Sequence, residues 1–178
     1  MKNIDQNQQT SQSERNVIGI AARRAKKLND DGLELFSNGK VNEALQCFIH
    51  STKIYPTAEG YTYWGWMLSF NGALDDAIEL CKKAISLDSD FGNPYNDIGM
   101  YYMKKGELEI AVPWLEQAKL AKRYLPRQFP FLNLGRIYLS QGFFLKALIE
   151  FEGALKFDPE NDELRAVVQR IRTSNHKI

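Results

Sequence analysis

The sequence is poor in the residues that carry out chemistry. Its 178 residues include two histidines and two cysteines, Cys47 and Cys81. It has no C-x-x-C pair, no cluster of cysteines and histidines, no glycine-rich phosphate loop and no Ser/His/Asp motif. We therefore predict a protein that is not an enzyme and uses no cofactor or metal, with both cysteines as small buried residues.

An excess of either charge is also missing. Lys and Arg total 23 and Asp and Glu total 22, a net charge of +1, so no overall field attracts nucleic acid or an anionic membrane. No apolar run is long enough to cross a bilayer, and the segment 1–15 lacks the apolar core of a signal peptide. These absences predict a cytoplasmic protein that binds neither nucleic acid nor membranes.

What the sequence does have is a regular array of glycines. Eight of its twelve glycines fall in four copies of the pattern G-x6-G-x4-A, offset from one another by 33, 34 and 36 residues. The copies are Gly32, Gly39 and Ala44; Gly65, Gly72 and Ala77; Gly99, Gly106 and Ala111; and Gly135, Gly142 and Ala147. A period near 34 residues is typical of helical solenoids.

Apolar residues repeat with the glycines and predict two helices in each copy. Large residues flank the first glycine, and small or apolar residues follow the alanine at helical spacing. The second glycine suits a helix C-terminus, where a positive φ is needed. The first glycine falls within a helix, where it costs about 1 kcal/mol relative to alanine. We therefore predict close packing of paired helices at the first glycine.

The combined pattern is large-x-x-Leu-Gly-x-x-Tyr, followed by Gly, Ala, Phe, Ala and Pro, and it resembles the tetratricopeptide repeat (TPR). Pro56 and Pro159 match the closing proline, whereas Ser89 and Arg123 replace it in the middle copies. The resemblance implies an all-α protein, a right-handed superhelical α-solenoid of helix pairs over residues 16–172. The repeats are expected at about 25–57, 58–91, 92–127 and 128–161.

Both ends of the chain differ from the repeats. Residues 1–15 are polar and predict a disordered tail, with the first helix starting directly after them. A capping helix at 162–172, started by Asn161 or Asp162, is expected to cover the last repeat before a short tail at 173–178. Its apolar face consists of Leu164, Val167, Val168 and Ile171.

In TPR proteins the first helix of each repeat lines a concave groove, so the resemblance implies a binding surface there. The matching positions hold Leu33, Phe36, Thr62, Tyr63, Trp66, Asn96, Met100, Met103, Leu132, Asn133 and Arg136, and Asn29 and Asp30 fall on the same side. This mixed apolar and amide lining predicts a non-catalytic interaction module or adaptor for a protein or peptide segment. For Trp66, Met100 and Met103, packing against a neighbouring helix is the other interpretation.

The resemblance also allows one class of partner to be tested. Some TPR cofactors bind the acidic C-termini of heat-shock chaperones through a clamp of lysine, asparagine and arginine. The corresponding positions here hold Asn29, Leu33, Tyr63, Asn93 and Asp97. Asp97 has the wrong sign for a carboxylate ligand, so this sequence is not expected to recognise those C-termini.

Several alternatives remain open at this stage. A small TPR chaperone of the bacterial secretion type would have a similar length. A helical-repeat RNA-binding protein could use Tyr63, Trp66, Asn96, Asn133 and Arg136, although backbone neutralisation requires more Lys and Arg. A second surface is the basic joint, which we define as Lys119, Lys122, Arg123 and Arg127. The expected oligomeric state is a monomer or a weak homodimer.

Overall fold

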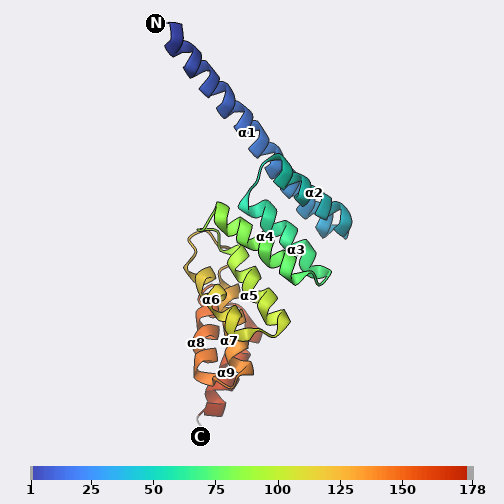
Figure 1. Ribbon diagram of the computed structural model, residues 1–178. Coiled ribbons are helices and arrows are strands. Elements are labelled where there is room, and N and C mark those ends of the chain that lie inside the picture. Colours follow the sequence, from blue (N-terminus) through green and yellow to red (C-terminus); the bar gives the residue numbers. More distant parts are fainter. Residues whose placement is uncertain (1, 176–178) are drawn as a thin grey trace. The chain divides into compact units, whose positions relative to one another are not determined.

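The computed structural model describes residues 2–175, with side chains described for residues 15–173. Within this range the chain folds into nine helices and forms no strand (Figure 1). The helices are α1 (Lys2–Ser37), α2 (Val41–Ile54), α3 (Ala58–Phe70), α4 (Leu74–Leu87), α5 (Asn93–Lys105), α6 (Leu108–Leu120), α7 (Gln128–Ser140), α8 (Phe144–Leu155) and α9 (Asp162–Asn175). The expected all-α solenoid of helix pairs, with a further helix at the end, is confirmed.

The chain divides into two compact units. Unit 1 is Met1–Leu87 and contains the pairs α1–α2 and α3–α4, whereas unit 2 is Asp88–Ile178 and contains α5 to α9. Within each unit, a first helix packs against the second helix of its own pair and against the first helix of the next pair. The first helices are α1 and α3 in unit 1, and α5 and α7 in unit 2.

The repeated glycines occupy the positions that their spacing predicted. A Cβ atom on Gly99 would lie 2.6 Å from side-chain atoms of Leu115, and one on Gly135 would lie 2.4 Å from the ring of Phe151. These separations are too short for non-bonded carbons, so the close packing of paired helices requires glycine. The second glycines all have φ between 77° and 79°, the left-handed conformation that ends a helix.

The repeated alanines form the centre of each helix pair. Ala44, Ala77, Ala111 and Ala147 are each completely buried. In unit 1, Ala44 packs with Phe48 and Met67, and in unit 2 Ala111 packs with Leu115, Leu134 and Ile137. Cys47 and Cys81 form no disulfide bond among the described residues; Cys81 is buried and Cys47 is half-buried.

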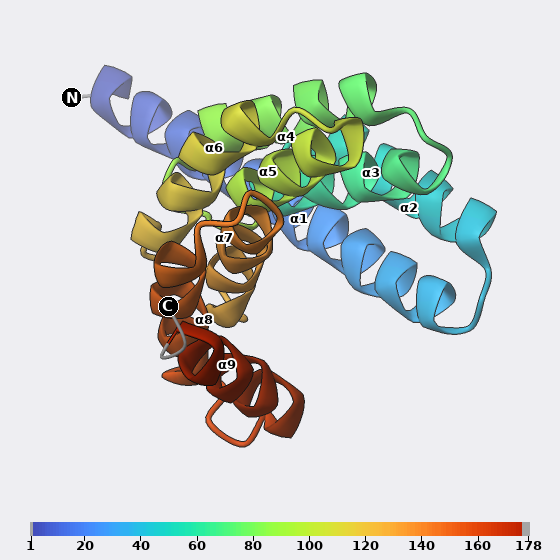
Figure 2. The same cartoon turned by 90° about the horizontal axis from the view of Figure 1, so that it is seen from below.

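Helix α9 covers the last repeat, and Figures 1 and 2 both show it lying beside α8. Asn161 begins the helix because its Oδ1 accepts a hydrogen bond of 2.9 Å from the backbone N–H of Leu164. The side chains of Leu164, Val168 and Ile171 are buried against Phe151 and the alanines of α8. The predicted capping face is therefore confirmed.

The ends of the chain differ from the boundaries that composition suggested. Helix α1 starts at Lys2, so its backbone includes the polar segment that we expected to be disordered. Residues 2–18 contain neither glycine nor proline, the two residues that most disfavour a helix, and their Gln and Glu residues are good helix formers. The first helix of the first repeat can therefore extend towards the N-terminus without interruption. At the other end α9 continues to Asn175, and the rest of the tail at 173–178 lies outside the described residues.

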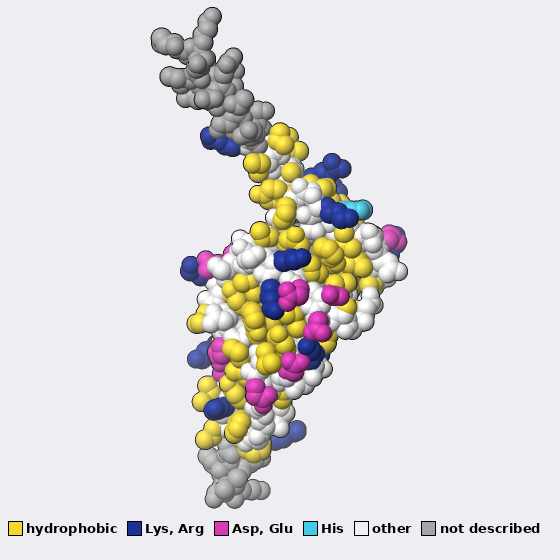
Figure 3. Space-filling view, in the orientation of Figure 1, with side chains coloured by type: hydrophobic (Ala, Val, Ile, Leu, Met, Phe, Trp, Pro, Cys, Tyr) yellow, Lys and Arg dark blue, Asp and Glu magenta, His cyan; other side chains and the backbone are white. Residues whose placement is uncertain are grey.

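Two surface features complete the fold. The part of α1 that begins at Arg15 exposes Val17, Ile18 and Ile20, which are 52–62% accessible. Figure 3 shows apolar side chains in yellow on this part of the surface. None of the helices described here has both the length and the apolar character that a bilayer crossing demands.

Candidate partner-binding face

The eleven predicted groove residues lie on the first helices of the two units. Leu33, Phe36, Thr62, Tyr63 and Trp66 belong to α1 and α3, and Asn96, Met100, Met103, Leu132, Asn133 and Arg136 belong to α5 and α7. We call the first set the unit 1 face and the second set the unit 2 face.

In unit 1 the aromatic residues pack against one another. The rings of Phe36 and Trp66 have centroids 4.4 Å apart, and that of Phe70 lies 5.4 Å from Trp66 and 5.5 Å from Phe36. Trp66 is half-buried in this cluster, whereas Leu33 and Phe70 are exposed. Trp66 therefore shares its surface between solvent and the aromatic cluster formed by α1 and α3.

The two other predicted residues of α3 have different surroundings. Thr62 is buried, and its hydroxyl donates a hydrogen bond of 2.7 Å to the carbonyl oxygen of Ala58 one helical turn earlier. Tyr63 is half-buried, with its ring centroid 5.2 Å from that of Phe48. Tyr63 also forms part of the wall of a pocket.

This pocket has a volume of about 400 Å³ and is formed entirely by unit 1. Its lining consists of Lys26, Asn29, Asp30, Thr57, Glu59 and Tyr63. Lys26 and Asp30 form an exposed ion pair at 2.8 Å, and the hydroxyl oxygen of Thr57 accepts the N–H of Gly60 at the start of α3. Most of the polar wall of the pocket is therefore already engaged.

Asn29 is the exception in this wall. Its side chain is 4% exposed, and its Oδ1 is buried without a hydrogen-bond donor from any described part of the chain. A buried amide oxygen without a donor is uncommon in native proteins. The resemblance to TPR proteins placed Asn29 on this face, but no sequence pattern shows whether a buried amide finds a partner.

In unit 2 the polar residues form a connected chain across α5 and α7. Asn133 donates through Nδ2 to Oδ1 of Asn96 at 3.0 Å, and both side chains are buried. Arg136 donates through Nη1 to Oδ1 of Asn133 at 3.3 Å and is itself exposed. The amides therefore join two successive repeats and hold a guanidinium group at the surface.

Asp97, also on α5, lies next to these hydrogen-bonded amides. Burial raises the pKa of its carboxyl group to about 7, while a hydrogen bond with Asn96 and the charge of Lys104 act in the opposite direction. Near neutral pH this carboxyl group is therefore divided between its neutral and charged forms.

The apolar residues of the unit 2 face are partly shared with its core. Met103 packs against the cluster around Leu115, and Leu132 packs against the cluster around Phe151. Met100 is half-buried. Met103 and Leu132 therefore present only part of their apolar surface on this face, whereas the polar residues of the face are linked by hydrogen bonds.

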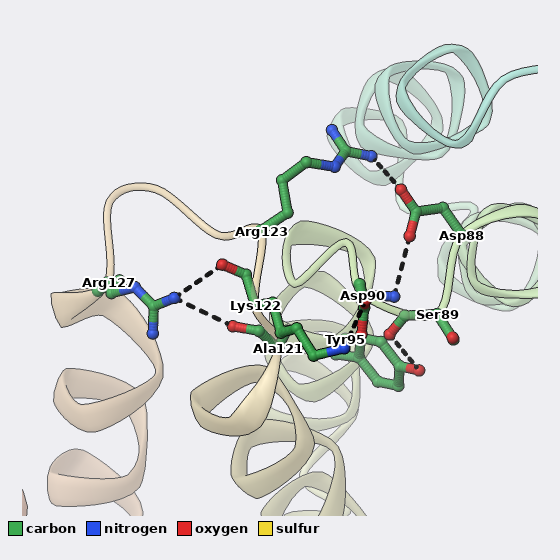
Figure 4. Close-up of polar contacts among 8 residues, drawn as sticks. All are labelled: Asp88, Ser89, Asp90, Tyr95, Ala121, Lys122, Arg123 and Arg127. Atoms are coloured by element: carbon green, nitrogen blue, oxygen red, sulfur yellow. Dashed lines mark hydrogen bonds and ion pairs between the residues drawn. The ribbon is translucent and has the colours of Figure 1, made fainter.

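The basic joint is occupied by interactions within unit 2 (Figure 4). Lys122 forms an ion pair with Asp90 at 2.9 Å, and Arg123 forms one with Asp88. Arg127 donates to the carbonyl oxygens of residues 121 and 122 at 3.3 and 2.9 Å. The hydrogen bond from the Arg123 guanidinium group lowers the pKa of the Asp88 carboxyl group.

Main-chain contacts bring together the same two segments of the joint. Gly92 donates its N–H to the carbonyl oxygen of Arg123, and Arg123 donates its N–H to that of Asp90, both at 2.9 Å. Lys119, the remaining member of the joint, pairs with Glu150 and Glu116 at 3.0 Å. Each cation of the basic joint therefore has an internal partner, which disfavours the joint as a contact for an acidic protein.

The described side chains include no group of three or more that could bind a metal ion.

Comparison with known proteins agrees with the helix pairing. Residues 93–123, which span α5, α6 and the start of the joint, match the family model described as tetratricopeptide repeat. The fold is that of a TPR protein. A search of curated proteins gave no match.

Solved TPR-like structures share the fold at low sequence identity. PilF of Pseudomonas aeruginosa has a TM-score of 0.80 at 19% identity, over 88% of this chain and 71% of PilF. PilW, described as a type IV pilus biogenesis factor, has a TM-score of 0.72 at 16% identity, over 84% and 69% of the two chains. YrrB, described as a TPR protein with an unusual peptide-binding site, has a TM-score of 0.60 at 16% identity, over 84% and 76%.

Proposed function

We propose that this TPR protein is a non-catalytic interaction module in which the first-helix face of each unit holds an extended segment of another protein. The observation that carries this proposal is Asn29, a buried amide without a donor in the wall of the α1–α3 pocket. YrrB and the TPR domain of RPAP3, described as bound to an HSP90 peptide, show that the fold supports peptide binding in those proteins.

The chemistry of the Asn29 amide favours a peptide as the ligand. Leaving a buried hydrogen-bonding group without a partner costs about 1–3 kcal/mol. A bound segment that enters the pocket and moves the wall at Asn29 supplies the missing donor through a main-chain N–H, and the amide of an asparagine also matches a peptide group in size and polarity. The ring of Tyr63 provides an apolar wall for the neighbouring side chain of such a segment.

The substitution Asn29→Leu separates binding from stability. It removes both polar atoms at nearly constant volume, so we expect an unchanged or higher melting temperature, because no buried oxygen is left without a donor. Partner capture from nuclease-treated native lysate by the full chain should be lost. Asn42→Leu, the same change at an exposed position of α2, should capture as the wild type does. Capture by Asn29→Leu at the wild-type level would refute the proposal.

The two alternatives from the sequence have less support. A secretion-type chaperone needs a continuous apolar surface, but Trp66, Met103 and Leu132 contribute much of their surface to internal packing. RNA binding needs cations that are available to phosphates, but the cations of the basic joint are all paired or hydrogen-bonded within unit 2.

A further inference from the structure

We propose that the unit 2 face reads an acidic residue of the bound segment, with Arg136 as the group that binds the carboxylate and Asn133 and Asn96 as the residues that position it. This inference rests on the proposed function, because it names the chemistry of the segment that the module holds. The positions differ from those of the chaperone clamp, which this sequence does not fill.

The availability of Arg136 is the first step. Several cations of unit 2 form ion pairs: Lys105, Lys119, Lys122, Arg123, Arg165 and Arg172 each lie within 4 Å of a carboxylate. Arg136 is exposed and has no carboxylate partner among the described residues. Its charge is therefore not neutralised within the part of the chain that the structure describes.

The second step is that the guanidinium group is held in place. Oδ1 of Asn133 accepts the bond from Nη1 of Arg136, and Nδ2 of the same amide donates to Asn96. Because Asn133 and Asn96 are 4% and 6% exposed, neither amide can reorient without losing a buried hydrogen bond. A free surface arginine loses side-chain entropy when it binds a ligand, and this arrangement reduces that loss.

The third step is the choice of ligand. An arginine that donates one N–H to an amide keeps its remaining donors for an acceptor, and its planar group matches the two oxygens of a carboxylate. Asp97 hydrogen-bonds to the same Asn96, so a doubly charged phosphate would meet a nearby acidic group. A singly charged carboxylate fits this surrounding better. The half-buried Met100 and Leu132 on the same helices offer apolar contact to the residues on either side of the acidic one.

The test uses peptide selection on the full chain. A random peptide library, displayed so that no free C-terminus is present, is selected on immobilised wild-type protein and on Arg136→Glu. We expect wild-type selection to enrich Asp or Glu at one register and Arg136→Glu to enrich Lys or Arg at that same register. Lys156→Glu makes the same charge change at an exposed residue outside this face, and should keep the wild-type preference.

The selected peptide then identifies the source of the carboxylate. Replacing its acidic residue by glutamine should weaken binding about tenfold, whereas amidation of its C-terminus should change binding little. A loss on amidation and none on replacement would show that a C-terminal carboxylate is bound, and would overturn the assignment to a side chain. Asn133→Ala should reduce the difference in affinity between the acidic peptide and the glutamine peptide. The affinity for the glutamine peptide should stay at the wild-type level.

The outcomes separate this inference from the function on which it rests. Peptides that are enriched without an acidic position, or an unchanged preference in Arg136→Glu, overturn the role of Arg136 and leave the interaction module standing. Failure to enrich any peptide on the wild-type protein overturns the proposed function, and the acidic-residue site with it.

Discussion

At the scale of single residues, glycine at the first repeated position determines whether two helices can pair. Helix propensity disfavours glycine there, yet the close approach of Leu115 to Gly99 leaves no room for a methyl group. At Gly19 in α1 glycine has no such packing role, because a Cβ atom would lie at an ordinary distance of 3.6 Å from its nearest neighbour, Arg23. Glycine there only weakens the helix.

A matched pair of substitutions tests this contrast. Gly99→Ala should lower the free energy of unfolding by about 1–3 kcal/mol because Leu115 must move in a packed core. Gly19→Ala should raise it by up to about 1 kcal/mol, since alanine is the better helix former and the site is open. Thermal unfolding followed by circular dichroism measures both. The same sign of change for the two variants would contradict the packing role of Gly99.

Asp97 gives a second prediction at this scale. Its pKa is about 7 in the folded protein and near 3.8 when unfolded, so the folded state holds its proton more tightly. Its contribution is therefore neutral at about pH 3.8 and below, becomes increasingly unfavourable as the pH rises towards 7, and stays so above it. Asp97→Asn should raise the melting temperature at pH 8 and change it little at pH 4. An equal effect at both pH values would rule out the ionisation of Asp97 as the cause.

The repeated residues were predictable because their role depends on spacing along a single helix pair. Gly99, Gly106 and Ala111 have an equivalent residue at the same spacing in each of the other copies, so periodicity alone identifies their environment. The bond between Asn96 and Asn133 was not predictable in this way, because it depends on the relative position of α5 and α7. The choice between the two interpretations of Trp66 could not be made from sequence for a related reason: its neighbours Phe36 and Phe70 lie at the ends of helices, where the repeat pattern specifies no residue.

At the scale of elements, α9 acts as a lid on the last repeat. Its buried residues Leu164, Val168 and Ile171 replace the contacts that a fifth helix pair would make with α8. An amphipathic helix with a charged outer face is enough to end such an array, since a solenoid repeat contacts its neighbours alone.

Removing α9 should therefore expose the core of the last repeat. Truncation at residue 161 uncovers Phe151 and the alanines of α8, and each large apolar side chain returned to water costs about 1.5–3 kcal/mol. We expect a lower melting temperature and self-association in analytical ultracentrifugation. Truncation after Thr173, which keeps all three buried residues, is the control. A stable monomer after removal of α9 would show that it is not a cap.

At the scale of the whole molecule, charge balance constrains what the protein can bind. The net charge of +1 gives no overall attraction for a polyanion, and the cations of the basic joint have partners within unit 2. One guanidinium that meets one carboxylate gives a weak dependence on salt, whereas release of several counterions from a nucleic acid gives a steep one.

The salt dependence of binding should reflect this difference. Raising the salt from about 50 to 200 mM should weaken binding of the selected acidic peptide by less than about tenfold, compared with about 10³-fold or more for a nucleic acid contacted at several phosphates. Fluorescence anisotropy at both salt concentrations, with a single-stranded RNA oligomer as the comparison, measures this. A steep loss for a tightly bound RNA would favour the helical-repeat RNA-binding alternative.

The two main-chain hydrogen bonds of the joint give the third repeat a property of its own. They join the backbone just before α5 to the backbone just after α6, so the chain leaves this repeat beside the place where it came in. A segment whose two ends are adjacent can be cut out, duplicated or inserted elsewhere with little change in the path of the flanking chain. Residues 88–124 are therefore a suitable unit for duplication in longer arrays, because the hydrogen bonds that hold the two ends together lie within the segment itself.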